Sequence, residues 1–222
     1  METKTVYFEN EGEGNSDAAL AAAWQRAKEL GIKTLVVAST RGSTAVKAVE
    51  VFQGMKVVIV THAYGGREPD TSEFLEENRQ IVEKKGGKIL TTTHAFGGVN
   101  GAFQSPMPRP AGGPPGGGAM PAGGPPQTGA PGGGPPPGGR PARIPVPGEI
   151  MAGTLSVFCR GMKVAAEVTL MAADAGLVRC DEEVIAIAGS GRGADTAVVV
   201  QPANTGRFFD LKIKEIICKP RT

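Results

Sequence analysis

Residues 33–66 read KTLVVASTRGSTAVKAVEVFQGMKVVIVTHAYGG, and this stretch decides the fold class. An apolar run at 33–39 leads through a Ser/Thr-rich loop into a helix that ends at Phe52, and a second apolar run follows at 56–61. Continuous apolar runs are typical of parallel strands that are covered on both faces. A strand–helix–strand unit of this kind predicts a parallel sheet with right-handed crossovers.

The same alternation continues on both sides of this stretch. Upstream, Ser16 and Gly31 look like the N-cap and C-cap of a helix over 16–30, and Ser43 or Thr44 would cap the helix after the first strand. Downstream we expect a helix that opens at Ser72, helical structure broken at Arg160-Gly161, and further strands over 88–93, 182–190, 197–203 and 211–220. The last two strands follow one another closely, so they predict an antiparallel hairpin at the sheet edge. The fold class is α/β, with helices on both faces of a mostly parallel sheet.

A Pro/Gly-rich segment interrupts this pattern. Between Pro106 and Gly148, 29 of 43 residues are Pro or Gly, and there is no three-residue period, so collagen is excluded. We interpret the chain as a single domain, 1–222, with a disordered insert at 105–147. A solvated spacer is favoured over a docking tether for polyproline-binding partners, because the insert lacks a sustained PxxP pattern.

Composition limits the classes of partner and compartment. The net charge of +2 comes mostly from three arginines in the insert, so nothing indicates the basic face of a nucleic-acid binder. Three cysteines without CxxC spacing indicate free thiols in a reducing compartment. The apolar region 150–178 is interrupted by charges, and the N-terminal residues lack the apolar core of a signal peptide. We therefore expect a cytoplasmic protein with no membrane contact.

The loop after the first strand has the residue types of a phosphate site. A helix N-terminus offers free amides and a partial positive charge to an anion. Gly42 permits close backbone approach, but a plain strand-to-helix turn remains the alternative, and the Walker A spacing is absent. The candidate phosphate-binding residues are Ser39, Thr40, Arg41, Gly42, Ser43 and Thr44.

A glycine-rich loop follows the strand at 182–190. It precedes a strand-like run instead of a helix, so it does not fit a dinucleotide fingerprint. A ligand-clamping loop is favoured, and a hairpin loop in which Arg192 merely pairs with Asp195 is the alternative. Its candidate ligand-binding residues are Gly189, Ser190, Gly191, Arg192, Gly193, Asp195 and Thr196.

The only two histidines lie in near-identical hexapeptides, THAYGG at 61–66 and THAFGG at 93–98, each directly after a predicted strand. A metal site is disfavoured, since each loop offers one ligand and catalytic zinc usually has three. His62 and His94 are candidate acid–base residues because imidazole titrates near neutrality. The alternatives, ligand contact or a structural loop with Tyr64 and Phe96 packed nearby, stay open. The candidate ligand-lining residues are His62, Tyr64, Gly65, His94 and Gly97.

The stretches 16–52, 55–65 and 165–203 together resemble the C-terminal α/β domain of pyruvate kinase. The closer resemblance is to stand-alone archaeal and bacterial proteins built of that domain alone; AGSGRGADTA (188–197) and LKIKEIICKPR (211–221) are the parts most specific to that group. The resemblance implies a three-layer αβα sandwich of about five strands in the order 3-2-1-4-5, with strand 5 antiparallel. It places the 39–44 and 189–196 loops side by side at the point where the strand order reverses.

The resemblance also carries a functional expectation. In pyruvate kinases this domain holds an allosteric sugar-phosphate site, and the loop that grips the phosphate there corresponds to residues 39–44. Here Thr40 and Arg41 precede Gly42 where the family loop has Lys before Ser-Gly, and the 189–196 loop differs as well, which argues against fructose bisphosphate. The kinase catalytic barrel is absent, so pyruvate kinase activity is not expected.

We therefore expect a ligand-binding or regulatory protein that holds a sugar phosphate or mononucleotide; FMN would suit such a site. The alternative is a small enzyme that acts on the same ligand with His62 or His94 as acid–base. The oligomeric state stays open, a homo-oligomer included.

Overall fold

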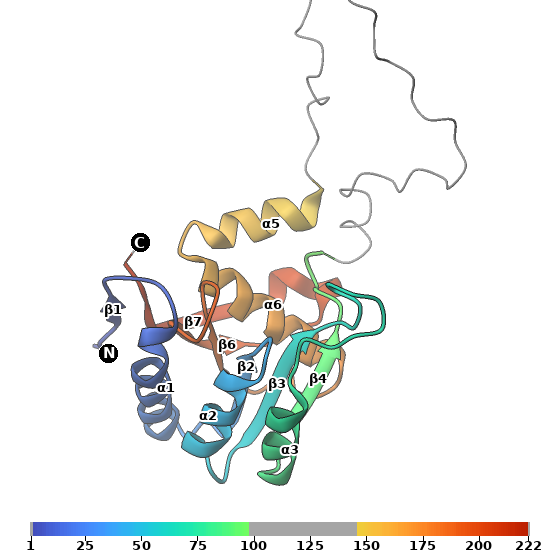
Figure 1. The fold of residues 1–222 in the computed structure, drawn as a ribbon. Helices are drawn as coiled ribbons and strands as arrows, with labels where there is room; N and C mark the ends of the chain where they lie inside the picture. Colours follow the sequence, from blue (N-terminus) through green and yellow to red (C-terminus); the bar gives the residue numbers. More distant parts are fainter. Residues whose placement is uncertain (1, 98–145, 222) are drawn as a thin grey trace, which may run out of the picture.

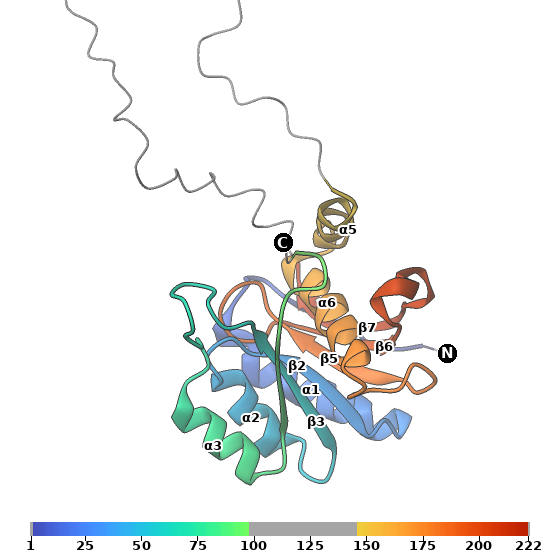
Figure 2. The ribbon, with the colours of Figure 1, turned by 90° about the vertical axis from the view of Figure 1, so that its right-hand side faces the viewer.

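Seven strands form one mixed sheet in the order β1-β7-β6-β5-β2-β3-β4, in a computed structural model that describes residues 2–97 and 146–221. Helices cover both of its faces (Figures 1 and 2). The strands are β1 (Val6–Phe8), β2 (Thr34–Ala38), β3 (Lys56–His62), β4 (Lys88–Thr92), β5 (Val184–Ala188), β6 (Thr196–Gln201) and β7 (Lys212–Pro220). The helices are α1 (Ser16–Leu30), α2 (Ser43–Val51), α3 (Glu76–Lys84), α5 (Pro147–Ser156) and α6 (Arg160–Asp174), with 3-10 turns η1 (Glu13–Asn15) and η2 (Thr205–Asp210).

The predicted α/β fold is confirmed, and the sheet contains the expected strand order as five of its seven strands. Five strands run β4-β3-β2-β5-β6, which is the expected order 3-2-1-4-5, and β6 is antiparallel to β5. The sheet has two strands more than expected, because β7 pairs antiparallel with β6 and β1 pairs parallel with β7. The prediction that the last hairpin forms the sheet edge is wrong, since β1 lies outside it. Three residues are too few to show a strand period in the sequence.

The core has two halves, one on each face of the sheet. Leu35 and Val37 of β2 pack with α1, α2 and α3, whereas Val36 between them packs with α6. Successive side chains of a strand point to opposite faces, so a strand covered on both sides must be apolar at every position. This explains why the strands read as continuous apolar runs instead of alternating ones.

Two helix ends differ from the sequence expectations. Gly31 is the left-handed C-cap of α1 as expected, with φ of 69°. Ser16 is the first residue of α1 instead of its N-cap, and its Oγ accepts a hydrogen bond from the amide of Ala194 at 2.9 Å. Neither Ser43 nor Thr44 caps α2, whose N-cap is Gly42 with φ of 99°. The N-caps are Asn15 for α1 and Gly42 for α2, and neither forms a side-chain capping hydrogen bond.

The boundaries of the later helices are also shifted. Ser72 does not open α3, which begins at Glu76; the Ser72 Oγ accepts the amide of Phe74 at 3.2 Å in the preceding turn. The region 148–177 forms two helices as expected, and the break lies just before Arg160, at 157–159. Pro147 already begins α5, and the rest of the expected 105–147 insert, apart from Val146, lies outside the described residues.

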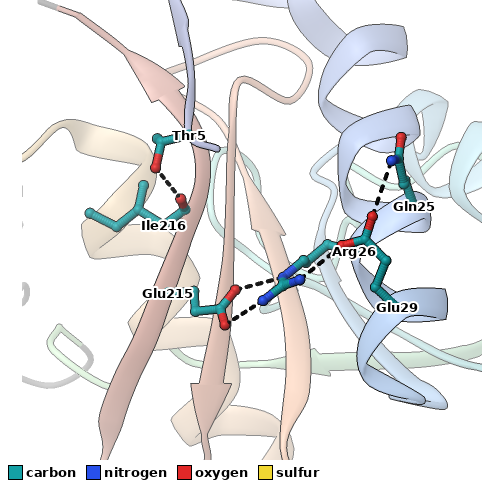
Figure 3. A network of polar contacts seen from close by, with 6 residues as sticks. All are labelled: Thr5, Gln25, Arg26, Glu29, Glu215 and Ile216. Carbon is teal, nitrogen blue, oxygen red and sulfur yellow. Dashed lines mark hydrogen bonds and ion pairs between the residues drawn. The ribbon is translucent and has the colours of Figure 1, made fainter. Parts of the chain in front are cut away.

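A polar network fastens α1 to the last strand of the chain (Figure 3). The Arg26 guanidinium donates from Nε and Nη2 to the two carboxylate oxygens of Glu215 on β7, each at 2.7 Å, and from Nη1 to Glu29 at 2.8 Å. This fork is the strongest geometry available to an Arg–carboxylate pair. Hydrogen bonding to Arg26 lowers the pKa of Glu215. On the other side of β7, the Thr5 hydroxyl donates to the carbonyl of Ile216 at 2.9 Å.

Among the helices within residues 2–97 and 146–221, none has the length and apolar character to cross a membrane.

Candidate functional site

Four loops gather at one edge of the sheet, because β2, β3, β4 and β5 are mutually parallel and their carboxyl ends lie together. The strand order reverses between β2 and β5, which are hydrogen-bonded neighbours. Ligands of open α/β sheets bind outside the carboxyl ends of the strands at such a point. The loops at 39–42 and 189–195 therefore flank the reversal, and the two histidine loops lie to one side of it.

The loop after β2 is held in place by hydrogen bonds to its own backbone. The Ser39 Oγ accepts the amide of Ala45 at 3.3 Å, and the Thr61 hydroxyl donates to the carbonyl of Thr40 at 3.2 Å. The carbonyl of Arg41 accepts from the side-chain amide of Asn78 at 2.9 Å. A Cβ on Gly42 would lie 2.5 Å from the Asn78 Cβ, so only glycine fits this close approach.

The candidate phosphate-binding residues divide into buried and accessible ones. Ser39 and Thr44 are 7% and 5% exposed, so they serve the loop's own structure. Arg41 and Ser43 are exposed, and Thr40 is half-buried. The N-cap of α2 is Gly42, which has no side chain, and Ser39 Oγ already accepts the first-turn amide of Ala45. The amides of Ser43 and Thr44 are left without an intrahelical partner. These amides, with the side chains of Thr40, Arg41 and Ser43, are the groups in this loop that an anion can reach.

The loop after β5 is organised around a buried carboxylate. Asp195 is 0% exposed and accepts hydrogen bonds from the amides of Gly12 and Ser190 and from the Thr196 hydroxyl, at 2.9, 3.2 and 2.8 Å. It therefore ties the loop to the N-terminal segment. No ion pair between Asp195 and Arg192 is formed in the described structure, and Arg192 is exposed.

Two glycines of the same loop are fixed by close packing. A Cβ on Gly189 would lie 2.2 Å from the carbonyl oxygen of Gly193, and one on Gly193 would lie 2.5 Å from the Ser16 Oγ. Gly191 has open space around it and is exposed. Of the expected ligand-binding residues here, Gly191 and Arg192 are accessible, whereas Ser190, Asp195 and Thr196 are buried.

The two histidines are brought together, with ring centroids 4.8 Å apart. Each directs one ring nitrogen to a carboxylate: the Nδ1 of His62 lies 3.2 Å from Glu73 Oε1, and the Nδ1 of His94 lies 3.3 Å from Glu167 Oε2. The two side chains are 41% and 44% exposed, so one side of each ring is open to solvent. The similarity of the two hexapeptides thus corresponds to a similar environment of the two imidazoles.

The aromatic residues of the two hexapeptides behave differently. Phe96 is buried and its ring meets that of Phe208 edge-on, with centroids 5.8 Å apart. Tyr64 is 57% exposed, so the alternative in which both aromatics pack in a structural loop does not hold for Tyr64. Gly65 and Gly97, the remaining candidates, are exposed turn residues whose amides donate to the carbonyls of Thr71 and His94.

Glu167 is the most unusual group of the site, because it is an acid with a side chain 1% exposed. Burial alone would raise its pKa, but hydrogen bonds from His94, Lys163 and the amide of Phe96 outweigh burial and lower the pKa to about 2. The carboxylate is therefore charged at neutral pH and can only accept hydrogen bonds. Glu73 has a cation of its own, with Arg67 Nε 3.0 Å from its Oε2.

The histidine pair also contacts the Ser/Thr-rich loop after β2. The Nε2 of His62 lies 3.4 Å from the Thr40 Oγ1. The His62 ring thus joins two regions that the sequence predicted separately, the Ser/Thr-rich loop after β2 and the histidine loop after β3.

Sequence reasoning missed both acids of the site. Glu167 had a signal: it is the one charged residue in the apolar stretch AAEVTLMAA (165–173), and a lone acid among core residues is almost always paired. Glu73 had none, since it lies in a polar loop 11 residues from its partner. Across residues 2–97 and 146–221, no group of three or more His, Cys, Asp or Glu side chains is arranged to hold a metal ion.

The comparison with known families agrees with this architecture. Residues 17–104 match the family model described as pyruvate kinase, alpha/beta domain. The matched stretch includes α1 to β4, and so the Ser/Thr-rich loop and both histidines. The resemblance inferred from the sequence is confirmed over residues 17–104, which are similar to the pyruvate kinase alpha/beta domain.

Proposed function

We propose that this protein binds a phosphorylated small molecule, a sugar phosphate or a mononucleotide such as FMN, at the carboxyl ends of β2 and β5, in a ligand-binding or regulatory role. One observation carries the proposal: the N-terminus of α2, where the first two amides have no intrahelical partner, lies at the reversal of strand order, with Thr40, Arg41 and Ser43 accessible beside it. The amides and the partial charge of the helix favour a phosphate there.

The pyruvate kinase resemblance supports the same location. The domain's sugar-phosphate site in those enzymes uses the loop that corresponds to 39–44. The proposal does not extend to pyruvate kinase activity, since the described residues form one α/β domain around a single sheet, with no catalytic barrel.

The sharpest test removes accessible groups and spares the buried ones. Gly42 and Thr44 are unsuitable targets, since a side chain at Gly42 would strain the loop and Thr44 is buried. The double variant Arg41→Gln/Ser43→Ala changes only exposed side chains. We expect it to lower the affinity for inorganic phosphate and for phosphomonoesters roughly tenfold in calorimetric titrations.

A matched control variant also removes one positive charge, but at a position away from the loop. Lys47→Gln removes one exposed cation on the same helix, where Lys47 pairs with Asp17 at 2.7 Å, and should leave the affinity within a factor of about two. If the double variant binds every phosphoester as wild type does, the proposed phosphate site is wrong. Mass spectrometry of molecules released from the purified protein on denaturation would identify the natural ligand.

A second function, an enzyme that uses His62 or His94 as acid–base on the same ligand, is favoured by the carboxylate partner of each imidazole. Acid–base histidines are commonly oriented through Nδ1 in this way. Replacing both histidines with Gln should then abolish turnover of a phosphorylated substrate and leave phosphate affinity within a few-fold. If the double variant loses binding as well as turnover, the histidines contact the ligand and the acid–base role is not supported.

A further inference from the structure

The two histidines are held alike by acids from unrelated parts of the chain. Glu73 lies in the loop between β3 and α3, and Glu167 lies within α6 on the other side of the sheet. Both reach the Nδ1 of their histidine, at 3.2 and 3.3 Å. Ring packing alone needs no carboxylate, and burying Glu167 is costly. The repeated arrangement therefore indicates that ring orientation and protonation matter at this place.

The contacts determine which ring nitrogen carries the proton. An ionised carboxylate only accepts hydrogen bonds, so Nδ1 must be the donor in each pair. In a neutral imidazole the other nitrogen, Nε2, is then an acceptor. The 3.4 Å contact from His62 Nε2 to the Thr40 hydroxyl fits this assignment, since the hydroxyl can supply the proton. The pair thus offers the Nε2 of His94 as an acceptor, and the Nε2 of His62 becomes a second one when a ligand hydroxyl takes the place of the Thr40 hydroxyl.

We infer that Glu73 and Glu167 are positioning residues that hold His62 and His94 in the Nδ1–H tautomer, and that the two Nε2 atoms accept hydrogen bonds from neighbouring hydroxyl groups of a polyhydroxylated phosphate monoester. The inference rests on the proposed phosphate site for the ligand's other end. Ring centroids 4.8 Å apart bring the two imidazoles close enough for one small molecule to contact both.

The charges around the pair argue for hydroxyl groups over a second phosphate. The charged groups that contact the imidazoles or their acids in the described structure are Glu73, Glu167, Arg67 and Lys163. Each cation is already paired with one of the two acids, so the four charges cancel. A second phosphate would meet two lone pairs with no free cation unless both rings took up a proton. Uncharged donors match the pair as it stands.

The tautomers can be measured without any ligand. Because the chain has only two histidines, nitrogen-15 NMR of the ring nitrogens assigns both signals with His62→Gln and His94→Gln as references. At about pH 8.5, where an ordinary imidazole is neutral, wild type should show Nδ1–H and unprotonated Nε2 in both rings. Glu73→Ala should move His62 alone to the tautomer mixture of a free imidazole, and Glu167→Gln should change His94 alone.

Glu77→Ala is the matched control for Glu73, since it removes an exposed acid in the first turn of α3 and should leave both spectra unchanged. A wild-type spectrum with the proton on Nε2 of either ring would overturn the positioning role. So would a Glu73→Ala spectrum with an unchanged His62. The wild-type spectrum alone shows which ring nitrogen carries the proton, so this test does not depend on the folding of any variant.

The ligand class is tested with two probes on the same carbon skeleton. Glycerol 3-phosphate carries two adjacent hydroxyls, and n-propyl phosphate carries none. Wild type should bind glycerol 3-phosphate roughly tenfold more tightly, and the His62→Gln/His94→Gln variant should bind both probes alike. The preference of wild type should persist or grow from pH 6 to 8.5, because a protonated Nε2 cannot accept a hydrogen bond.

The possible failures are distinguishable. Equal affinity of wild type for the two probes overturns the hydroxyl assignment and leaves the phosphate site standing. Binding that strengthens toward pH 6 and favours a bisphosphate shows that the histidine pair is protonated and binds a second anion. That result also overturns the hydroxyl assignment. If neither probe nor inorganic phosphate binds, the proposed function fails and the ligand assignment fails with it, whereas the tautomer result stands by itself.

Discussion

Lys163 and Glu167 lie one turn apart on α6 and form an ion pair whose partners are buried to different extents. The Glu167 side chain is 1% exposed and that of Lys163 is 24% exposed. The carboxylate also accepts the amide of Phe96 at 3.0 Å and faces His94. The pair thus fastens α6 to the loop after β4. Removing only one partner of a buried ion pair is destabilising, because the other charge stays buried without compensation.

Removing one partner should therefore cost more than removing both. We expect Lys163→Met to lower the free energy of unfolding by about 2–4 kcal/mol, because it leaves a buried carboxylate with less compensation. Lys163→Met combined with Glu167→Gln should recover part of that loss, for a coupling energy of about 1–2 kcal/mol. Urea denaturation of the two single variants and the double variant measures this. Strictly additive losses would show that the two side chains act independently.

Glu167 should also make the free energy of unfolding depend on pH. Its pKa of about 2 in the folded protein lies below the roughly 4.3 of an ordinary glutamate. The stabilisation, on the order of 3 kcal/mol, is fully present above about pH 4.3, and it is lost as the pH falls toward 2. The difference in unfolding free energy between wild type and Glu167→Gln should therefore shrink as the pH is lowered from 6 to 3. Glu77→Gln, an exposed control, should show a small difference throughout.

The glycines of the β5–β6 loop should differ sharply in tolerance. At Gly193, φ is +75° and a Cβ would meet Glu13 Cα and Ser16 Oγ at 2.5 Å. Gly193→Ala should lower the free energy of unfolding by about 2–4 kcal/mol through strain and displaced packing. Gly191→Ala, two residues away in open space, should change it by less than about 0.5 kcal/mol. Thermal unfolding of the two variants tests this, and equal midpoints would contradict the packing of this loop against α1.

Thiol reactivity should separate the three cysteines. Cys159 and Cys218 are buried, and Cys180 is exposed. Burial raises the pKa of the Cys218 thiol to about 12, so it holds almost no reactive thiolate at neutral pH. Iodoacetamide should therefore label Cys180 alone in the folded protein and all three cysteines in urea, as read by peptide mass spectrometry. Rapid labelling of Cys218 under native conditions would show that β7 opens readily.

The sheet was predictable to the extent that each strand is a buried apolar run. β2, β3 and β5 show such runs, and the strand order followed once the family resemblance was recognised. β1 was missed because Val6–Phe8 owes its strand form to pairing with β7, which is non-local information. Ser16 was misplaced for a similar reason, since its hydroxyl serves Ala194, far away in the sequence.

The candidate site was predictable only where it is local. The loop at 39–44 and the two histidine hexapeptides are contiguous motifs, so their residue types and their position after strands were visible. The partners Glu73 and Glu167 come from 11 and 73 residues away. No spacing rule connects them to the histidines, and only the crossing of α6 behind the sheet brings Glu167 to His94.

The parallel pairing of β1 with β7 imposes an order on folding during synthesis. Val6 pairs with Cys218, and the amide of Gly12 bonds to Asp195. At roughly 5–20 residues per second, a ribosome needs on the order of 10–40 s to deliver those partners after the first strand has emerged. The five strands β2 to β6 and both helical layers can assemble before β7, the neighbour of β1, has been made. The first strand to be translated is thus among the last to dock, and a nascent chain halted before β7 would leave it unpaired.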